Sequence, residues 1–192
     1  MRYLFVCVFL LPFAPAIFAQ NEATSGRLFK PFKVAISAGY ASPQRSAPGA
    51  KFNGGGIFAI EPKWAVIDPL AIGVRVEAAI IAHVYDNGRN SDNSNGKANL
   101  SYILTLDYYF TKTKFRPFIG AGAGIYTTAA LDSSSVSSGI GSIPATSQFG
   151  SMVRVGFEVG HLRLAAEYNF VANNASYLGV KLGVCIGGGR RK

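Results

Sequence analysis

The stretch AIGVRVEAAIIAHV, residues 71–84, alternates between two kinds of side chain. Every second residue, beginning with Ile72, is apolar, whereas the intervening positions include Arg75, Glu77 and His83. Successive side chains of an extended strand point to opposite faces, so this alternation predicts a β-strand with one apolar and one polar face. In a soluble sheet the apolar face lies in the core, but in a membrane barrel it lies against lipid.

Similar segments recur along most of the chain, and none of them predicts a helix. Turn residues separate them, and their connections are alternately long and short over most of the sequence. This order predicts an all-β protein, an eight-stranded antiparallel up-and-down transmembrane β-barrel. We expect its strands at 32–41, 55–65, 71–84, 98–110, 117–128, 147–160, 162–171 and 176–186.

The two faces of these strands differ in charge. One face collects large apolar and aromatic residues and carries no charged residue, whereas the other combines charges with many small residues. Only 15% of the residues are charged, less than the roughly one quarter usual in soluble proteins. Small and paired polar residues suit the narrow lumen of an eight-strand barrel, so we assign the apolar face to lipid.

The aromatic residues of the apolar face gather near both ends of the strands, as two interfacial girdles would. The segment PFIGAGAGIY can present either of two faces to lipid. One choice exposes Ile119 and Ile125 with the alanines between them, and the other exposes Phe118 and Tyr126. We expect the first.

The positions of the predicted turns show which charged residues of the inward face lie opposite one another on neighbouring strands. A two-residue turn at Gly160-His161 places Glu158 opposite Arg163, and Arg154 opposite Glu167. Turns centred near Asn174 and Asp68 place Lys181 opposite Glu167, and Arg75 opposite Glu61. Buried charges need such partners. The predicted lumen charge lattice comprises Glu61, Arg75, Glu77, Arg154, Glu158, Arg163, Glu167 and Lys181.

The N-terminal sequence MRYLFVCVFLLPFAPAIFAQ has a basic residue, an apolar run and small residues before Gln20. These features predict a secretory signal peptide over residues 1–19, which would leave Cys185 as the one cysteine of the mature chain. The expected domains are the signal peptide 1–19, a periplasmic segment 20–31, the outer-membrane barrel 32–187 and a basic tail 188–192.

Three stretches, FRPFIGAGAGIY, VRVGFEVGHLRLAAEYNFV and YLGVKLGV, together with the signal peptide, resemble the small outer-membrane β-barrel family of Gram-negative bacteria. This family includes OmpX-like, OmpW-like and OmpA-barrel-like proteins. The resemblance covers about residues 30–187 and implies a location in the cell outer membrane. It also implies contact with outer-membrane lipids and with the barrel-assembly machinery. The chain departs from the family by ending in GGGRRK and not in an aromatic residue.

Enzymatic signals are weak, so we expect no enzyme, no cofactor and no metal site. The two histidines, His83 and His161, fall at opposite strand ends and cannot share a catalytic site. Most of the excess in the net charge of +9 lies near the short turns and termini, which suits anionic lipid headgroups and not nucleic acid.

The expected function is a structural, adhesive or membrane-interaction role, with extracellular contacts through loops 85–97 and 131–146. One alternative is a secreted, soluble lipocalin-like barrel that binds a small apolar ligand. Others are a narrow channel for ions or small solutes and, by analogy with related barrels, a lipid-modifying enzyme.

Overall fold

The computed structural model describes residues 28–44, 50–85, 94–132, 145–172 and 175–190. The predicted signal peptide 1–19 lies outside these residues. So do residues 86–93 and 133–144, which make up most of the two predicted contact loops.

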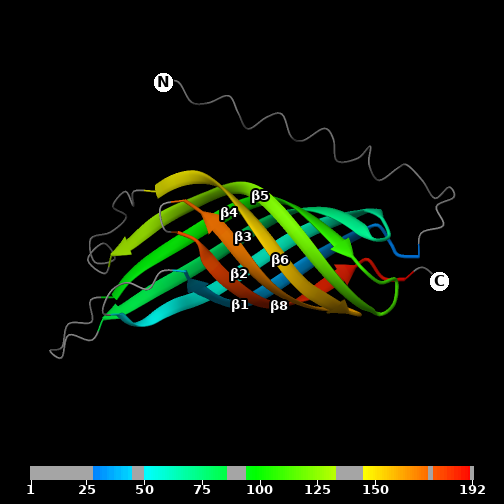
Figure 1. The fold of residues 1–192 in the computed structure, drawn as a ribbon, viewed down its shortest axis with the longest axis horizontal. Helices are drawn as coiled ribbons and strands as arrows, with labels where there is room; N and C mark the ends of the chain where they lie inside the picture. Colours follow the sequence, from blue (N-terminus) through cyan, green and yellow to red (C-terminus); the bar gives the residue numbers. More distant parts are fainter. Residues whose placement is uncertain (1–27, 45–49, 86–93, 133–144, 173–174, 191–192) are drawn as a thin grey trace, which may run out of the picture.

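Eight antiparallel strands form one closed barrel in which each strand pairs with its sequence neighbours and β1 pairs with β8 (Figure 1). The predicted fold is therefore confirmed. No helix in the described ranges is long and apolar enough to cross a membrane. The strands are β1 Phe32–Pro43, β2 Ala50–Ile67, β3 Leu70–Tyr85, β4 Ser94–Tyr109, β5 Phe115–Asp132, β6 Ala145–Val159, β7 Leu162–Val171 and β8 Tyr177–Gly187.

The two ends of the barrel differ. β1 begins and β8 ends at the same end, which also carries the β2–β3, β4–β5 and β6–β7 connections; we call it the short-turn end (Figure 1). The opposite end is the long-loop end. There β2 and β4 begin earlier than predicted, at Ala50 and Ser94. These extensions lack the apolar alternation of the barrel wall, so the sequence pattern gave no sign of them.

The barrel is inside out relative to a soluble protein. In β3, the side chains of Arg75 and Glu77 are 0% and 1% exposed, whereas Val74 and Val76 are 51% and 39% exposed. The other strands likewise bury their charged side chains and expose their large apolar ones, so the outer surface of the barrel is apolar and its lumen is charged. A surface of this kind is stable against lipid and not against water. The structure therefore assigns the apolar face of AIGVRVEAAIIAHV to the bilayer.

The orientation of β5 follows the preferred prediction. Ile119 and Ile125 point outward and are 47% and 53% exposed, whereas Phe118 and Tyr126 are 1% and 0% exposed in the lumen. Glycines occupy the inward positions between those two aromatic residues. At Gly120 an added Cβ would lie 2.2 Å from Oδ1 of Asp107 and 2.9 Å from the Leu106 carbonyl oxygen. This glycine therefore leaves space for a charged side chain of the neighbouring strand.

We expect Gly120→Ala to destabilise the folded barrel by about 1–3 kcal/mol, because the added methyl group overpacks the lumen against Asp107. Urea unfolding followed through the fluorescence of the single tryptophan, Trp64, measures the change. The matched control is Gly56→Ala, where an added Cβ meets nothing within 4 Å. Equal midpoints for the two variants would contradict the close approach at Gly120.

Candidate functional site: the charge clusters of the lumen

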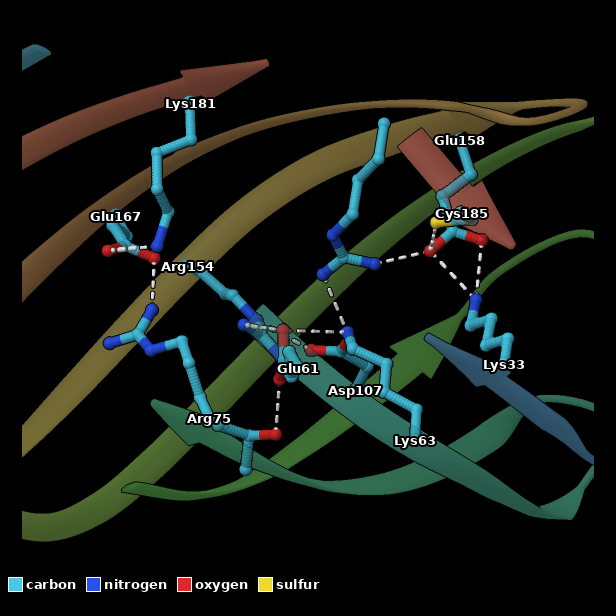
Figure 2. Close-up of polar contacts among 12 residues, drawn as sticks. Lys33, Glu61, Lys63, Arg75, Asp107, Arg154, Glu158, Glu167, Lys181 and Cys185 are labelled. Atoms are coloured by element: carbon cyan, nitrogen blue, oxygen red, sulfur yellow. Dashed lines mark hydrogen bonds and ion pairs between the residues drawn. The ribbon is translucent and has the colours of Figure 1, made fainter. Parts of the chain in front are cut away.

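Charged side chains fill much of the lumen. All eight residues of the predicted lattice are buried, and Lys33, Lys63 and Asp107 are buried with them. Six of the eleven are cations and five are carboxylates. Because removing a charge from water costs several kcal/mol, each of these groups needs a partner of opposite charge. The ion pairs sort them into two clusters (Figure 2).

The Asp107 cluster comprises Glu61, Lys63, Asp107, Arg154 and Arg163. Arg154 binds both acids: its Nη1 and Nη2 lie 3.0 and 2.7 Å from the two carboxylate oxygens of Glu61, and its Nε lies 2.7 Å from Oδ1 of Asp107. Oδ2 of Asp107 accepts hydrogen bonds from Lys63 and, at 3.0 Å, from Nη2 of Arg163. One carboxylate from β4 is therefore shared by cations from β2, β6 and β7.

Glu158 extends this cluster toward the short-turn end. Its Oε2 lies 2.6 Å from Nζ of Lys33, and its Oε1 accepts from Arg163 and, at 2.7 Å, from the hydroxyl of Tyr109. The Arg163 guanidinium also stacks 3.8 Å from the centre of the Phe118 ring. The glutamate, the arginine and the tyrosine are thus fixed by contacts from several strands.

The Glu167 cluster comprises Arg75, Glu77, Glu167 and Lys181. Nη1 of Arg75 lies 2.5 Å from Glu167, and Nζ of Lys181 lies 2.5 Å from Glu77 and 2.7 Å from Glu167. Arg75 also contacts Glu77 at 3.3 Å. The hydroxyl of Tyr177 donates to Glu77 at 2.6 Å. Two cations and two carboxylates therefore neutralise one another across β3, β7 and β8.

The structure allows the predicted facing pairs to be compared one by one. Glu158 lies opposite Arg163 and forms an ion pair with it. Arg154 lies opposite Glu167 in the register, yet its ion pairs are with Glu61 and Asp107.

The two other predicted pairings involve β8 and β2. Lys181 lies opposite Ala165, and Gly179 lies opposite Glu167, so the predicted register of β7 and β8 is wrong by two residues. The shift arises at the turn, where Ser176 Oγ accepts from the Val171 amide and donates to the Val171 carbonyl, at 3.0 and 2.9 Å. A shift of two preserves the face, so Lys181 still points inward and reaches Glu167 diagonally. The β2–β3 register agrees with the prediction, since Ile60 pairs with Val76 and Lys63 with Gly73, but Glu61 forms its ion pairs with Arg154 and Lys63.

Uncharged polar residues of the lumen were absent from the predicted site. Tyr109, Tyr126 and Tyr177 are 2%, 0% and 0% exposed, and each hydroxyl donates to a lumen acceptor. Asn169 accepts from Tyr126 at 2.8 Å and from Arg75 at 3.2 Å. Each tyrosine lies an even number of residues from inward-facing residues of its own strand. This spacing could have predicted from the sequence that the three tyrosines face the lumen.

Little space remains between the two clusters. A cavity of about 10 Å³ is lined by residues of both clusters, among them Glu61, Arg154, Glu167 and Lys181. This is about the smallest volume that can hold one water molecule. The described part of the lumen is thus filled by side chains at the level of the clusters.

The histidines lie far from each other. His83 belongs to β3 near the long-loop end, where its backbone pairs with Asn53 and Asn95. His161 lies in the β6–β7 turn at the short-turn end, and its Nδ1 lies 2.9 Å from the Cys185 carbonyl oxygen. Among the described residues, no group of three His, Cys, Asp or Glu side chains could hold a metal ion.

No family model and no curated protein matches the sequence. Among solved structures, the barrel is similar to the outer membrane protein OprG from Pseudomonas aeruginosa, with a TM-score of 0.51 and 13% identity over 84% of this chain and 98% of that one. The chain has the fold of the small outer-membrane β-barrels. The apolar exterior is a transmembrane surface, and the predicted location in the outer membrane agrees with this fold.

Two further small outer-membrane barrels align with lower TM-scores. Neisserial surface protein A (NspA) has a TM-score of 0.49 and 18% identity, covering 83% of this chain and 98% of that one. Ail of Yersinia pestis, in complex with the heparin analogue sucrose octasulfate, has a TM-score of 0.45 and 13% identity, covering 81% and 97%.

Proposed function

We propose that this small outer-membrane barrel is a non-enzymatic scaffold that anchors its surface loops in the membrane and does not conduct solutes. The small cavity left between the two ion-paired clusters of the lumen is the observation that carries this proposal. The cavity between the two charge clusters measures about 10 Å³, and both clusters are held by ion pairs between side chains of different strands.

A scaffold needs a rigid wall, and the lumen provides the contacts for one. Asp107 links β4 to β2, β6 and β7, and Glu167 links β7 to β3 and β8. The predicted contact loops were 85–97 and 131–146, but their outer residues belong to strands, because β3 ends at Tyr85, β4 begins at Ser94, β5 ends at Asp132 and β6 begins at Ala145. We propose the connections between these strands as the surfaces for extracellular contacts. Loops on a rigid barrel tolerate sequence change and carry contacts in many proteins.

The soluble lipocalin-like alternative is not favoured, because such a barrel keeps its apolar residues inside. Here the exposed residues include Leu104 at 65%, Phe149 at 73% and Leu182 at 60%, whereas the lumen is charged. The other alternative, a narrow channel, would need a continuous water path through both charge clusters.

Conductance across a planar lipid bilayer tests the closed lumen. We expect the purified protein to give no discrete conductance steps, because ion pairs occupy the lumen at two levels. Stable ion-selective steps in the wild-type protein would contradict the proposal.

Surface labelling of intact cells tests the scaffold role. An epitope inserted next to Asn93 should be accessible to antibody without permeabilisation, and the mature chain should begin at Gln20 and fractionate with the outer membrane. An epitope that appears only after permeabilisation would contradict the proposed topology. Recovery of the protein in a detergent-free periplasmic extract would contradict the membrane location.

A further inference from the structure

A second, larger cavity opens at the short-turn end of the barrel. It measures about 360 Å³, which lies within the range of small-molecule sites. Its walls come from the inner surface of the barrel, from the β4–β5 and β6–β7 turns and from the chain segments before β1 and after β8. The Lys30 amide donates to the Gly189 carbonyl at 2.9 Å and holds the two terminal segments together. We call this cavity the mouth pocket.

The charges around the mouth pocket do not balance. Among the described residues, four cations line it, namely Lys33, Lys114, Arg116 and Arg190, and Glu158 is the one carboxylate. Glu158 is already bound by Lys33 and by Arg163. Lys114 and Arg190 are exposed and have no ion pair within the part of the chain that the structure describes. The pocket therefore carries positive charge that an anionic ligand would neutralise.

Arg116 is held in place without an ion pair to any carboxylate of the described ranges. Its guanidinium contacts two aromatic rings, 4.1 Å from the centre of the Phe29 ring and 4.2 Å from that of the Tyr109 ring. Its Nη2 donates to the Asp68 carbonyl at 2.9 Å. The side chain is 9% exposed, and its Nε has no hydrogen-bond partner among the described residues. Stacking of this kind fixes an arginine without neutralising its charge.

The remaining wall is suited to an apolar group. The Phe29 ring, the glycines Gly187–Gly189 and the thiol of Cys185 all line the pocket. Cys185 is a free cysteine, and its Sγ lies 3.8 Å from Oε1 of Glu158. Pockets that bind small molecules commonly combine such apolar walls with a few charged groups.

We propose that the mouth pocket binds a small soluble organic anion, with a phosphate or carboxylate group on a compact apolar body. Lys114, Arg116 and Arg190 supply the cationic side, and Phe29 supplies the apolar side. The pocket opens at the mouth of the lumen and not on the lipid-facing wall, which favours a soluble ligand over a membrane lipid. The proposal does not depend on the scaffold role. The pocket shares Lys33 and Glu158 with the edge of the Asp107 cluster, but the cations proposed to bind the ligand, Lys114, Arg116 and Arg190, belong neither to the surface loops nor to the two clusters.

Calorimetric titration with phenyl phosphate, on the protein purified in a nonionic detergent, tests this proposal. We expect saturable binding at one site, with weaker binding of inorganic phosphate, which lacks the apolar body, and of phenol, which lacks the charge. Lys114→Glu should weaken phenyl phosphate binding about tenfold, which corresponds to the loss of one charge-assisted contact. The matched control is Lys112→Glu, an exposed lysine of the same turn outside the pocket, which should change the affinity less than about twofold because salt screens it.

Cys185 supplies a second readout inside the pocket. Phenyl phosphate should slow its modification by the small neutral reagent methyl methanethiosulfonate, and phenol should not. Absence of saturable binding, or equal effects of Lys114→Glu and Lys112→Glu, would overturn the proposal. Equal affinity for inorganic phosphate would overturn the apolar part of it. Displacement of phenyl phosphate by phosphatidylglycerol in mixed micelles would overturn the soluble ligand in favour of a lipid headgroup.

Discussion

Asp107→Leu is expected to cause the largest loss of stability of any single neutral substitution in the lumen. The Asp107 carboxylate is shared by Lys63, Arg154 and Arg163, and its removal leaves three buried cations with fewer acceptors. Breaking one buried pair typically costs about 3–5 kcal/mol. We expect a loss at the upper end of that range or above it, measured as the urea midpoint of the barrel refolded in detergent micelles.

Thr105→Val is the matched control for this prediction. Thr105 points inward from the same strand, is 2% exposed, and donates one hydrogen bond to Glu61 at 2.5 Å. Its loss should cost about 1 kcal/mol, because Glu61 keeps its contacts with Arg154 and Lys63. If the leucine variant does not refold, Asp107→Asn, which keeps the shape and removes the charge, provides the measurement. A loss no greater than that of Thr105→Val would show that Asp107 does not organise the cluster.

The sequence predicted which side of each strand faces the lumen better than it predicted which charged residues form ion pairs there. A period of two residues decides the face, and Arg75, Glu77, Arg154 and Lys181 all point inward as expected. Adjacent-strand pairing was expected to supply the ion-pair partners as well. In the closed barrel, however, Arg75 of β3 binds Glu167 of β7, and Lys63 of β2 binds Asp107 of β4. These pairs join strands that are not neighbours in the sheet. They form across the lumen of the closed barrel, so the alternation within a single strand could not predict them.

Turn geometry explains the error in the register of β7 and β8. The sequence ANNA suggested a symmetric loop centred on Asn174, but Ser176 is bonded to both backbone groups of Val171. The last pair is therefore Asn169 with Tyr177. The mouth pocket was equally hidden from the sequence, because its walls come from segments as distant as Phe29, Arg116 and Arg190. The bridge between Phe29 and Arg190 forms only when the two chain ends meet.

Glu167→Lys should also destabilise the barrel strongly, by about 3–5 kcal/mol, because it places an introduced ammonium beside Arg75 and Lys181, with Glu77 as the one remaining carboxylate of the cluster. Reversal of an exposed charge, Lys112→Glu, should change the stability by about 0–1 kcal/mol. The midpoint of urea unfolding in detergent micelles compares the two variants. Equal, small effects would mean that the charged face meets bulk water.

The decisive version of this experiment adds Lys181→Glu to Glu167→Lys. The double variant again has two cations and two carboxylates in the Glu167 cluster, and the exchanged pair occupies positions whose charged atoms lie 2.7 Å apart. We therefore expect it to be more stable than Glu167→Lys alone, because a coupled pair does not follow the sum of its single effects. Lys181→Glu by itself should destabilise the barrel, since it leaves Arg75 as the one cation beside three carboxylates. Additive losses in the double variant would show that the two positions are not coupled across β7 and β8.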